Sequence, residues 1–149
     1  MTNRLLRILE ILCTDGPCEI DRLIADCDWY PAARLTSEFE KKWDLRKKCF
    51  NAVNELKSLG LAHAHFEITE RGSDLLDSEA IFDDRVSGLL GELRRLGPAD
   101  LETLRDNRPG YERPTVAERL HMLRDLGLVR LTYWLSEAGR MLTQKRIFE

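Results

Sequence analysis

Aromatic side chains are scarce in this sequence, and long apolar runs are absent from it. Only 7% of the 149 residues are Phe, Trp or Tyr, so a hydrophobic core must be built mainly from Leu, Ile, Val and Ala. The apolar runs last a few residues, whereas a membrane-spanning helix needs roughly 20. Arg7 and Glu10 interrupt the apolar N-terminal segment, which predicts a first helix and not a signal peptide. We therefore expect a cytoplasmic protein with no membrane partner.

The four cysteines lack the spacing of a metal site. There is no C-x-x-C pair and no trailing H-x-x-x-H among or after Cys13, Cys18, Cys27 and Cys49. One hypothesis is a thiolate metal or redox sensor. The other is four reduced thiols that pack as small hydrophobic groups. The irregular spacing favours the second hypothesis, and we expect neither a metal nor a cofactor.

Neither sign of charge dominates the chain, and catalytic motifs are missing. The 23 basic and 26 acidic residues give a net charge of −3, without the broad basic excess that is typical of nucleic-acid-binding proteins. The sequence contains no G-x-S-x-G, no H-E-x-x-H and no Gly-rich phosphate loop. These absences favour a binding protein over an enzyme.

What the sequence does contain is an internal repeat. Residues 45–76 align without gaps on residues 112–143, and the identical pairs include Gly60 with Gly127. Upstream, the apolar positions 5, 8, 9 and 12 correspond to 86, 89, 90 and 93, but at a larger offset. The difference between the two offsets indicates an insertion in the first copy. We therefore predict two domains, 1–79 and 80–149, of which the first carries an extra helical insertion near 28–43.

Each copy has the pattern of three helices, a hairpin and a last helix. Apolar residues at helical spacing predict a first helix over 5–12 and 86–93, which Gly-Pro ends. Second helices are expected near 19–26 and 99–106, and third helices near 45–59 and 113–126. The third helices have core stripes at Cys49, Val53 and Leu56 and at Val116, Leu120 and Leu123.

After the third helix, each copy continues with a glycine and a short segment of mixed polar and apolar residues. Gly60 and Gly127 stand where a residue just past a helix adopts a left-handed conformation. The segments that follow predict a hairpin of two very short strands, and Thr69 or Ser136 then caps the last helix. The expected fold class is mainly α with short β-hairpins, an α+β arrangement.

This order, with L-x-x-L-G-L followed by [IL]-[TS]-E-x-G-x-x-L, resembles the winged helix-turn-helix superfamily. It is most similar to bacterial repressors of the MarR, PadR and ArsR types, and the resemblance covers nearly the whole chain as two tandem copies. The resemblance implies tandem winged-helix domains. It implies less about function, because tandem winged helices also serve as protein-interaction modules, as in kleisin-binding proteins and ESCRT-II subunits.

In the DNA-binding members of this superfamily the third helix enters the major groove, and the wing touches the flanking backbone. The resemblance therefore implies a DNA-reading face opposite the core stripe of the third helix. Lysines on such a face neutralise phosphates, and an Asn amide pairs with adenine. The candidate contacts in the first copy are Lys41, Lys42, Arg46, Lys47, Lys48, Asn51 and Asn54. Those in the second copy are Arg113, Thr115 and Arg119.

Other features weaken a symmetrical reading of DNA. Glu118 and Asp125 stand on the same face as the second set of contacts, where phosphates would repel them. The wings offer few basic residues, and His63 and His65 are either exposed wing residues or half of a metal or pH-sensing site.

An acidic stretch follows Glu70, with Ile81 and Phe82 expected to pack between the domains. The aromatic residues Trp29, Tyr30, Trp43, Tyr133 and Trp134 either stack on bases or, as we expect, cover the edges of the small cores.

The leading hypothesis is a DNA-binding transcriptional regulator, in which two covalently linked winged helices act as a pseudo-dimer on double-stranded DNA. The alternative is a protein–protein interaction adaptor or inhibitor, such as a chromosome-complex subunit or a phage-coded protein that blocks a host machine. The chain could be a monomer or a homodimer under either hypothesis. The near-neutral charge favours the alternative, and the basic third helix of the first copy favours DNA.

Overall fold

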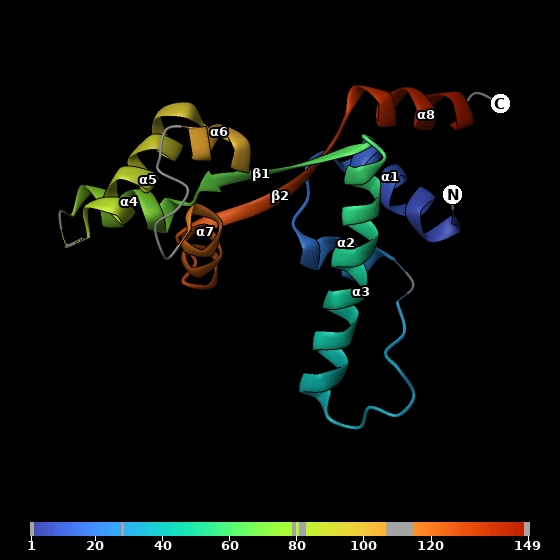
Figure 1. The fold of residues 1–149 in the computed structure, drawn as a ribbon. Coiled ribbons are helices and arrows are strands. Elements are labelled where there is room, and N and C mark those ends of the chain that lie inside the picture. Colours follow the sequence, from blue (N-terminus) through green and yellow to red (C-terminus); the bar gives the residue numbers. More distant parts are fainter. Residues whose placement is uncertain (1, 28, 79, 81–82, 107–114, 148–149) are drawn as a thin grey trace. The chain divides into compact units, whose positions relative to one another are not determined.

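The computed structural model describes residues 2–27, 29–78, 80, 83–106 and 115–147. In this part of the chain it is a mainly helical α+β structure, with eight helices and one two-stranded antiparallel sheet (Figure 1). None of the helices described is long and apolar enough to cross a membrane. The elements are α1 (Asn3–Asp15), α2 (Ile20–Asp26), α3 (Glu38–Ser58), β1 (Ala62–Ile68), α4 (Glu70–Asp77), α5 (Asp84–Leu96), α6 (Leu101–Asp106), α7 (Val116–Asp125), β2 (Val129–Leu135) and α8 (Glu137–Ile147).

The chain forms two compact units, each of which combines segments from both halves of the sequence. Unit 1 consists of residues 1–63 and 133–149, and unit 2 of residues 64–132. The chain therefore passes between the units twice, each time within a strand. These units do not coincide with the consecutive domains 1–79 and 80–149 expected from the sequence, because the last helix of each repeat packs in the other unit.

Unit 1 contains α1, α2, α3 and α8, with the end of β2. Helix α1 buries one side against α2 and α3 and also contacts α8. The predicted core stripe of α3 is confirmed, since Cys49, Val53 and Leu56 are fully buried. A bridge between Cys18 and Tyr133 joins the segment before α2 to β2.

Unit 2 repeats this arrangement with α5, α6, α7 and α4, and with the end of β1. Helix α5 packs on α4, and α6 packs on α7. The predicted stripe of Val116, Leu120 and Leu123 is buried here as well. The bridge between Phe66 and Ala99 corresponds to the one between Tyr133 and Cys18 in unit 1. The two units are therefore built on the same plan, as the sequence repeat predicts.

Helices α3 and α7 have matched ends. Ser37 accepts a hydrogen bond from the amide of Glu40, and Thr115 accepts one from Glu118, so both helices begin with the same capping pattern. In both helices the second residue after the last helical residue is a glycine with positive φ, 73° at Gly60 and 76° at Gly127. The predicted left-handed glycines are thus confirmed.

The predicted hairpins are wrong. A single seven-residue strand follows each glycine, β1 after Gly60 and β2 after Gly127, and these two strands pair with each other. The segments are too short for two strands and a turn, and they lack the Asn-Gly or Asp-Gly pair that favours a tight hairpin. Each backbone ladder is therefore completed by the strand of the other repeat.

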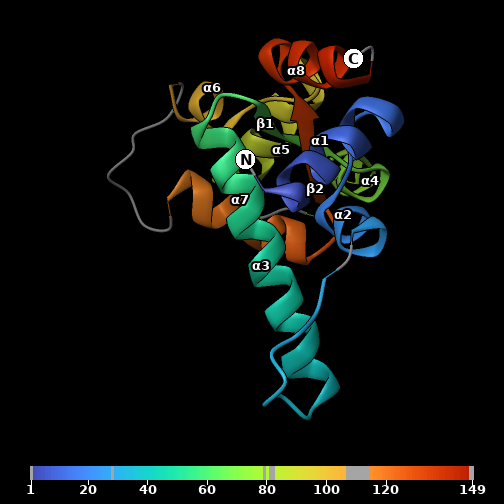
Figure 2. The ribbon, with the colours of Figure 1, turned by 90° about the vertical axis from the view of Figure 1, so that its right-hand side faces the viewer.

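The insertion in the first copy is only partly helical. The structure shows an extended segment with one turn over 29–37, after which α3 begins at Glu38. Helix α3 is 21 residues long and α7 is 10 residues long, so part of the insertion lengthens α3 at its N-terminal end. Figures 1 and 2 show the first turns of α3 extending past α1 and α2, with the segment 29–37 alongside.

Candidate nucleic-acid interface

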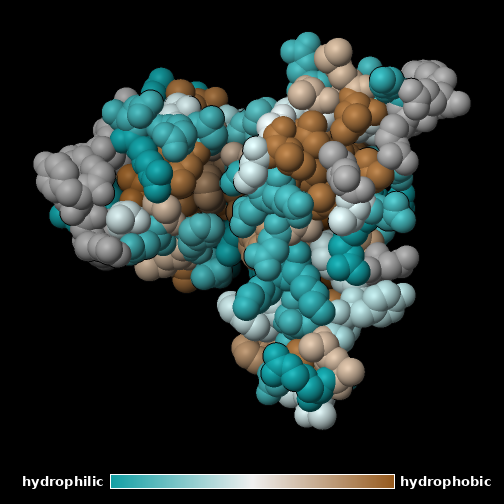
Figure 3. All heavy atoms as spheres, turned by 45° about the vertical axis from the view of Figure 1, so that its right-hand side comes forward, coloured by the Kyte–Doolittle hydropathy of each residue, from teal (hydrophilic) through white to brown (hydrophobic). Residues whose placement is uncertain are grey.

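One stripe of α3 faces solvent opposite the core. Positions 47, 51, 54 and 58 follow one another at helical spacing, and all four residues are exposed. This stripe places the ammonium group of Lys47 beside the amides of Asn51 and Asn54 on one surface. Figure 3 shows mostly hydrophilic atoms along the visible side of α3, with apolar atoms toward its lower end.

Two of the predicted lysines are engaged within the unit. The Nζ of Lys48 lies 3.0 Å from the Asp44 carboxylate and donates to the carbonyl of Tyr30 at 2.7 Å. Asp44 also accepts a hydrogen bond from the amide of Ala32 at 2.9 Å. Together these bonds fasten the segment 29–37 to α3. Lys41 pairs with Glu38 at 3.5 Å, so its charge is partly balanced.

The ion pair lowers the pKa of Asp44. The hydrogen bond from Lys48 is the main cause, and the amide of Ala32 adds to it. Asp44 therefore stays ionised and holds Lys48 in place. Lys48 acts in the structure as a clamp on the inserted segment, which the sequence alone did not indicate.

The other predicted residues of α3 remain accessible to different degrees. Lys42, Lys47, Asn51 and Asn54 are exposed, and Arg46 is half-buried. Glu40 and Glu55 are exposed on the same helix and reduce its net positive charge. The accessible set is thus a small basic and amide surface, not a broad cationic patch.

The equivalent face of α7 differs from the prediction. Arg113 lies outside the described residues, as do Ile81 and Phe82. Thr115 caps α7 through its side-chain oxygen. Arg119 is only 6% exposed, and its Nη2 makes no hydrogen bond within the described part of the chain. The candidate contact Arg119 therefore lies in the interior of unit 2 and not on the exposed face of α7.

The exposed face of α7 carries a mixture of groups. Glu118, His121, Met122 and Asp125 face solvent there. The ring of His121 packs edge-on against Phe66, with centroids 5.9 Å apart, and burial on that side lowers its pKa. Two carboxylates and an apolar Met give this face little affinity for phosphates.

The strands supply little positive charge. In unit 2 the guanidinium of Arg130 lies 2.6 Å from the carboxylate of Glu67. His63 is exposed and His65 is half-buried. No group of three His, Cys, Asp or Glu side chains in the described ranges is placed to hold a metal ion.

Three exposed aromatic residues were not expected. Tyr30, Phe39 and Trp43 are 70%, 79% and 65% exposed, whereas Tyr30 and Trp43 were expected to cover core edges. Trp29 does cover a core edge, since it is buried and donates to the carbonyl of Leu23. The signal that could have revealed the exposed group is the insertion itself, because inserted segments lie outside the core that the two repeats share.

The cysteines are all free thiols, three of them buried. Burial raises the pKa of Cys49 to about 12 and also raises the pKa of Cys18 and of Cys27.

Comparisons with models of known protein families, with curated proteins and with solved structures find no match for this chain.

Proposed function

We propose that the chain is a DNA-binding regulator built from two winged-helix units, with α3 as its main reading element. The observation that carries the proposal is the exposed stripe of Lys47, Asn51 and Asn54, opposite the buried stripe of α3. The element order of both repeats supports the fold part of the proposal, since in each repeat three helices precede a strand and a final helix. In this proposal the strand and the final helix of each unit come from the other repeat.

The chemistry of the stripe matches the two tasks of a DNA-binding helix. Lys47, with Lys42 and Arg46 nearby on α3, would neutralise phosphates and supply the salt-dependent part of the affinity. The amides of Asn51 and Asn54 can each present a donor and an acceptor to an adenine edge in the major groove. Because Lys48 is held by Asp44 and Tyr30, it contributes less to DNA than its position in the sequence suggests.

The units would contribute unequally. The α7 face of unit 2 carries Glu118 and Asp125, and Arg119 is buried. We therefore assign the affinity for DNA to unit 1. Glu118 and Asp125 already weakened a symmetrical reading of DNA in the sequence, and the burial of Arg119 adds to this asymmetry.

The test is fluorescence anisotropy with a labelled mixed-sequence duplex at several salt concentrations. Three cations on α3 predict a slope of log K against log[salt] of about −2 to −3. Lys47→Glu should weaken binding by at least about tenfold and flatten the slope by about 1 or more, because it removes a phosphate contact and adds a repulsive charge. Lys48→Gln should change the affinity little.

Lys145→Glu is the matched control, because it makes the same charge change at an exposed lysine of α8. Equal weakening by Lys145→Glu and Lys47→Glu would show a general charge effect and no reading helix. Absence of binding at about 50 mM salt, where the phosphate attraction is strong, would overturn the proposal altogether.

A second candidate function is a protein-interaction adaptor, and the exposed aromatic residues favour it. Tyr30, Phe39 and Trp43 lie at or near the N-terminal part of α3. Aromatic residues exposed to this extent are typical of the energetic centres of protein interfaces. Under this function a purified partner should lose at least about tenfold in affinity on Trp43→Ala, whereas Met141→Ala, which truncates a side chain with the same 65% exposure, should leave it unchanged. DNA binding that is insensitive to Trp43→Ala but lost in Lys47→Glu would favour the first function.

A further inference from the structure

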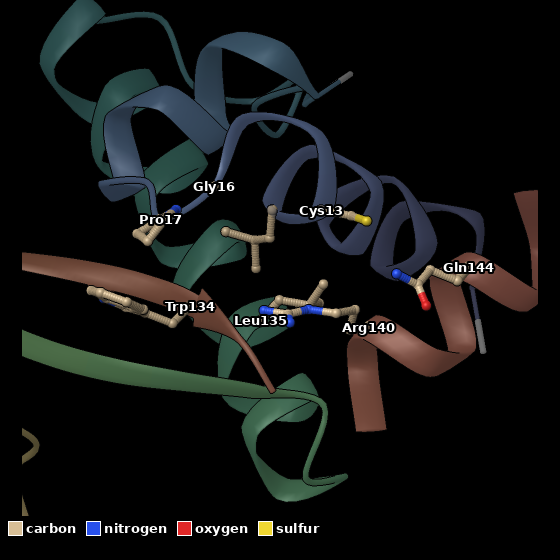
Figure 4. A pocket seen from close by; sticks show the side chains of 8 residues that line it. Cys13, Gly16, Pro17, Trp134, Leu135, Arg140 and Gln144 are labelled. Atoms are coloured by element: carbon tan, nitrogen blue, oxygen red, sulfur yellow. The ribbon is translucent and has the colours of Figure 1, made fainter. Parts of the chain in front are cut away.

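A cavity of about 420 Å³ lies within unit 1 between the end of α1, the end of β2 and helix α8 (Figure 4). Its volume is in the range of small-molecule sites, about 300–1,000 Å³. Most of its lining is apolar or neutral, and one cationic side chain, Arg140, belongs to it. The lining residues are Leu12, Cys13, Gly16, Pro17, Trp134, Leu135, Arg140 and Gln144.

The same place in unit 2 is occupied by an ion pair. The repeat makes Arg94 equivalent to Cys13, Asp77 to Gln144 and Ser73 to Arg140. In unit 2 the Nη1 of Arg94 lies 2.6 Å from the carboxylate of Asp77 and 3.4 Å from the hydroxyl of Ser73. These bonds link α5 to α4, the counterparts of α1 and α8.

Unit 1 has a different residue type at each of the three equivalent positions. Cys13 is too short to reach across as Arg94 does, and Gln144 carries no charge to attract a cation. Arg140 adds a guanidinium where unit 2 has a serine, and its side chain forms no ion pair within the described residues. Unit 1 therefore has an open space and a guanidinium without an ion-pair partner among the described residues, at the position where unit 2 has the Arg94–Asp77 pair.

The lining selects a class of ligand. A guanidinium matches the geometry of a carboxylate with two parallel hydrogen bonds. A phosphate monoester would bring about −1.5 to −2 charges to a single cation, whereas a monocarboxylate brings one. Leu12, Leu135 and Trp134 offer apolar surface to the rest of the molecule, and the amide of Gln144 can bond to a further polar group.

We propose that this cavity is a binding site for a small apolar or aromatic monocarboxylate. Arg140 binds the carboxylate of this ligand, and Trp134 contacts its apolar part. Figure 4 shows Arg140 and Gln144 reaching from α8 and Cys13 facing them from α1. This proposal does not depend on DNA binding, because the cavity is formed by α1, β2 and α8 and not by α3.

The experiment is a titration of the ¹⁵N-labelled protein, followed through the Trp134 indole and Gln144 amide resonances. The probes are benzoate, phenylacetate and hexanoate, with benzamide as the neutral analogue of benzoate. We expect saturable shifts of both resonances with at least one carboxylate and none with benzamide. Arg140→Gln should weaken binding by about tenfold or more, because it removes the charged partner.

The repeat provides a variant that closes the cavity without destroying the fold. Cys13→Arg with Gln144→Asp transfers the Arg94–Asp77 pair into unit 1, and it should abolish the shift of the Trp134 indole resonance, which this variant retains, while the protein keeps its thermal stability. Lys145→Gln is the control, because it removes an exposed charge of α8 outside the cavity lining.

Three results would overturn the proposal. The first is no saturable shift with any of the carboxylates up to about 10 mM. The second is equal binding of benzoate and benzamide by the unmodified protein, a comparison that needs no variant to fold. The third is carboxylate binding that survives both Arg140→Gln and the double substitution, which would place the ligand elsewhere.

Discussion

The hydroxyl of Ser136 donates to the carbonyl of Gly60 at 2.7 Å and accepts a hydrogen bond from the amide of Gly139 at 3.0 Å. Thr69 repeats this relationship in unit 2, where it donates to the carbonyl of Gly127 at 2.7 Å and caps α4 through the amide of Gly72. One side chain in each unit thus joins the end of the third helix to the start of the final helix. The final helix of each unit is supplied by the other repeat, so these contacts hold together segments distant in the sequence.

Ser136→Ala should destabilise the protein by about 1–2 kcal/mol, because both the cap and the bond to Gly60 are lost. Urea unfolding monitored by circular dichroism measures the change. Ser136→Thr is the matched control, since Thr69 makes the same two bonds in unit 2. Equal losses in the alanine and threonine variants would show that the hydroxyl has no such role.

Two glycines stand where no side chain fits. A Cβ at Gly139 would lie 2.2 Å from the carbonyl oxygen of Leu61, and a Cβ at Gly72 would lie 2.2 Å from that of Leu128. Because the obstacle is backbone, Gly139→Ala and Gly72→Ala should each cost about 2–4 kcal/mol of unfolding free energy.

Gly91→Ala provides the comparison for this pair. Gly91 lies inside α5, and nothing stands within 4 Å of its added Cβ. The substitution should stabilise the helix by about 0.5–1 kcal/mol. Thermal unfolding of the three variants should therefore move in opposite directions, and a loss in Gly91→Ala as large as in Gly139→Ala would contradict the contact argument.

The buried thiol of Cys49 predicts a loss of stability in alkali. Its pKa is about 12 in the folded protein and lower in the unfolded chain, where the thiol is hydrated. The folded state therefore binds more protons between about pH 9 and 12, and the free energy of unfolding should fall as the pH rises through this range. The fall should be shallower in Cys49→Ala, and an identical slope in both proteins would contradict the assignment.

The lowered pKa of His121 predicts that stability falls as the pH decreases from neutrality, whereas the Cys49 thiol makes stability fall as the pH rises. Burial, and then the charge of Arg124, lower its pKa, so the unfolded chain takes up the proton first as the pH falls. Stability should decrease below about pH 6.5, where an unperturbed histidine begins to protonate. The thermal midpoint of His121→Gln should show less of this decrease between about pH 7 and 5, and an NMR titration of the imidazole should place its pKa below the usual range.

The sequence itself determined the local structure of this protein. The apolar stripes, the capping residues Ser37 and Thr115 and the positive-φ glycines are short-range features, so helices and helix ends could be predicted from the residues around them. The same patterns placed Lys47, Asn51 and Asn54 opposite a core stripe. They could not show that Lys48 is held by Asp44, since this bond depends on how the inserted segment returns to α3.

Tertiary structure decided what completes each unit. A strand with one unpaired edge has no local preference for its partner, and the hydrogen bonds of β1 were satisfied by β2 from the other repeat, not by a hairpin of its own. That pairing brings α8 to α1 in unit 1 and α4 to α5 in unit 2. The cavity at Arg140 follows from the same pairing, because its walls come from residues more than a hundred positions apart in the chain, and no pattern along the sequence could have joined them.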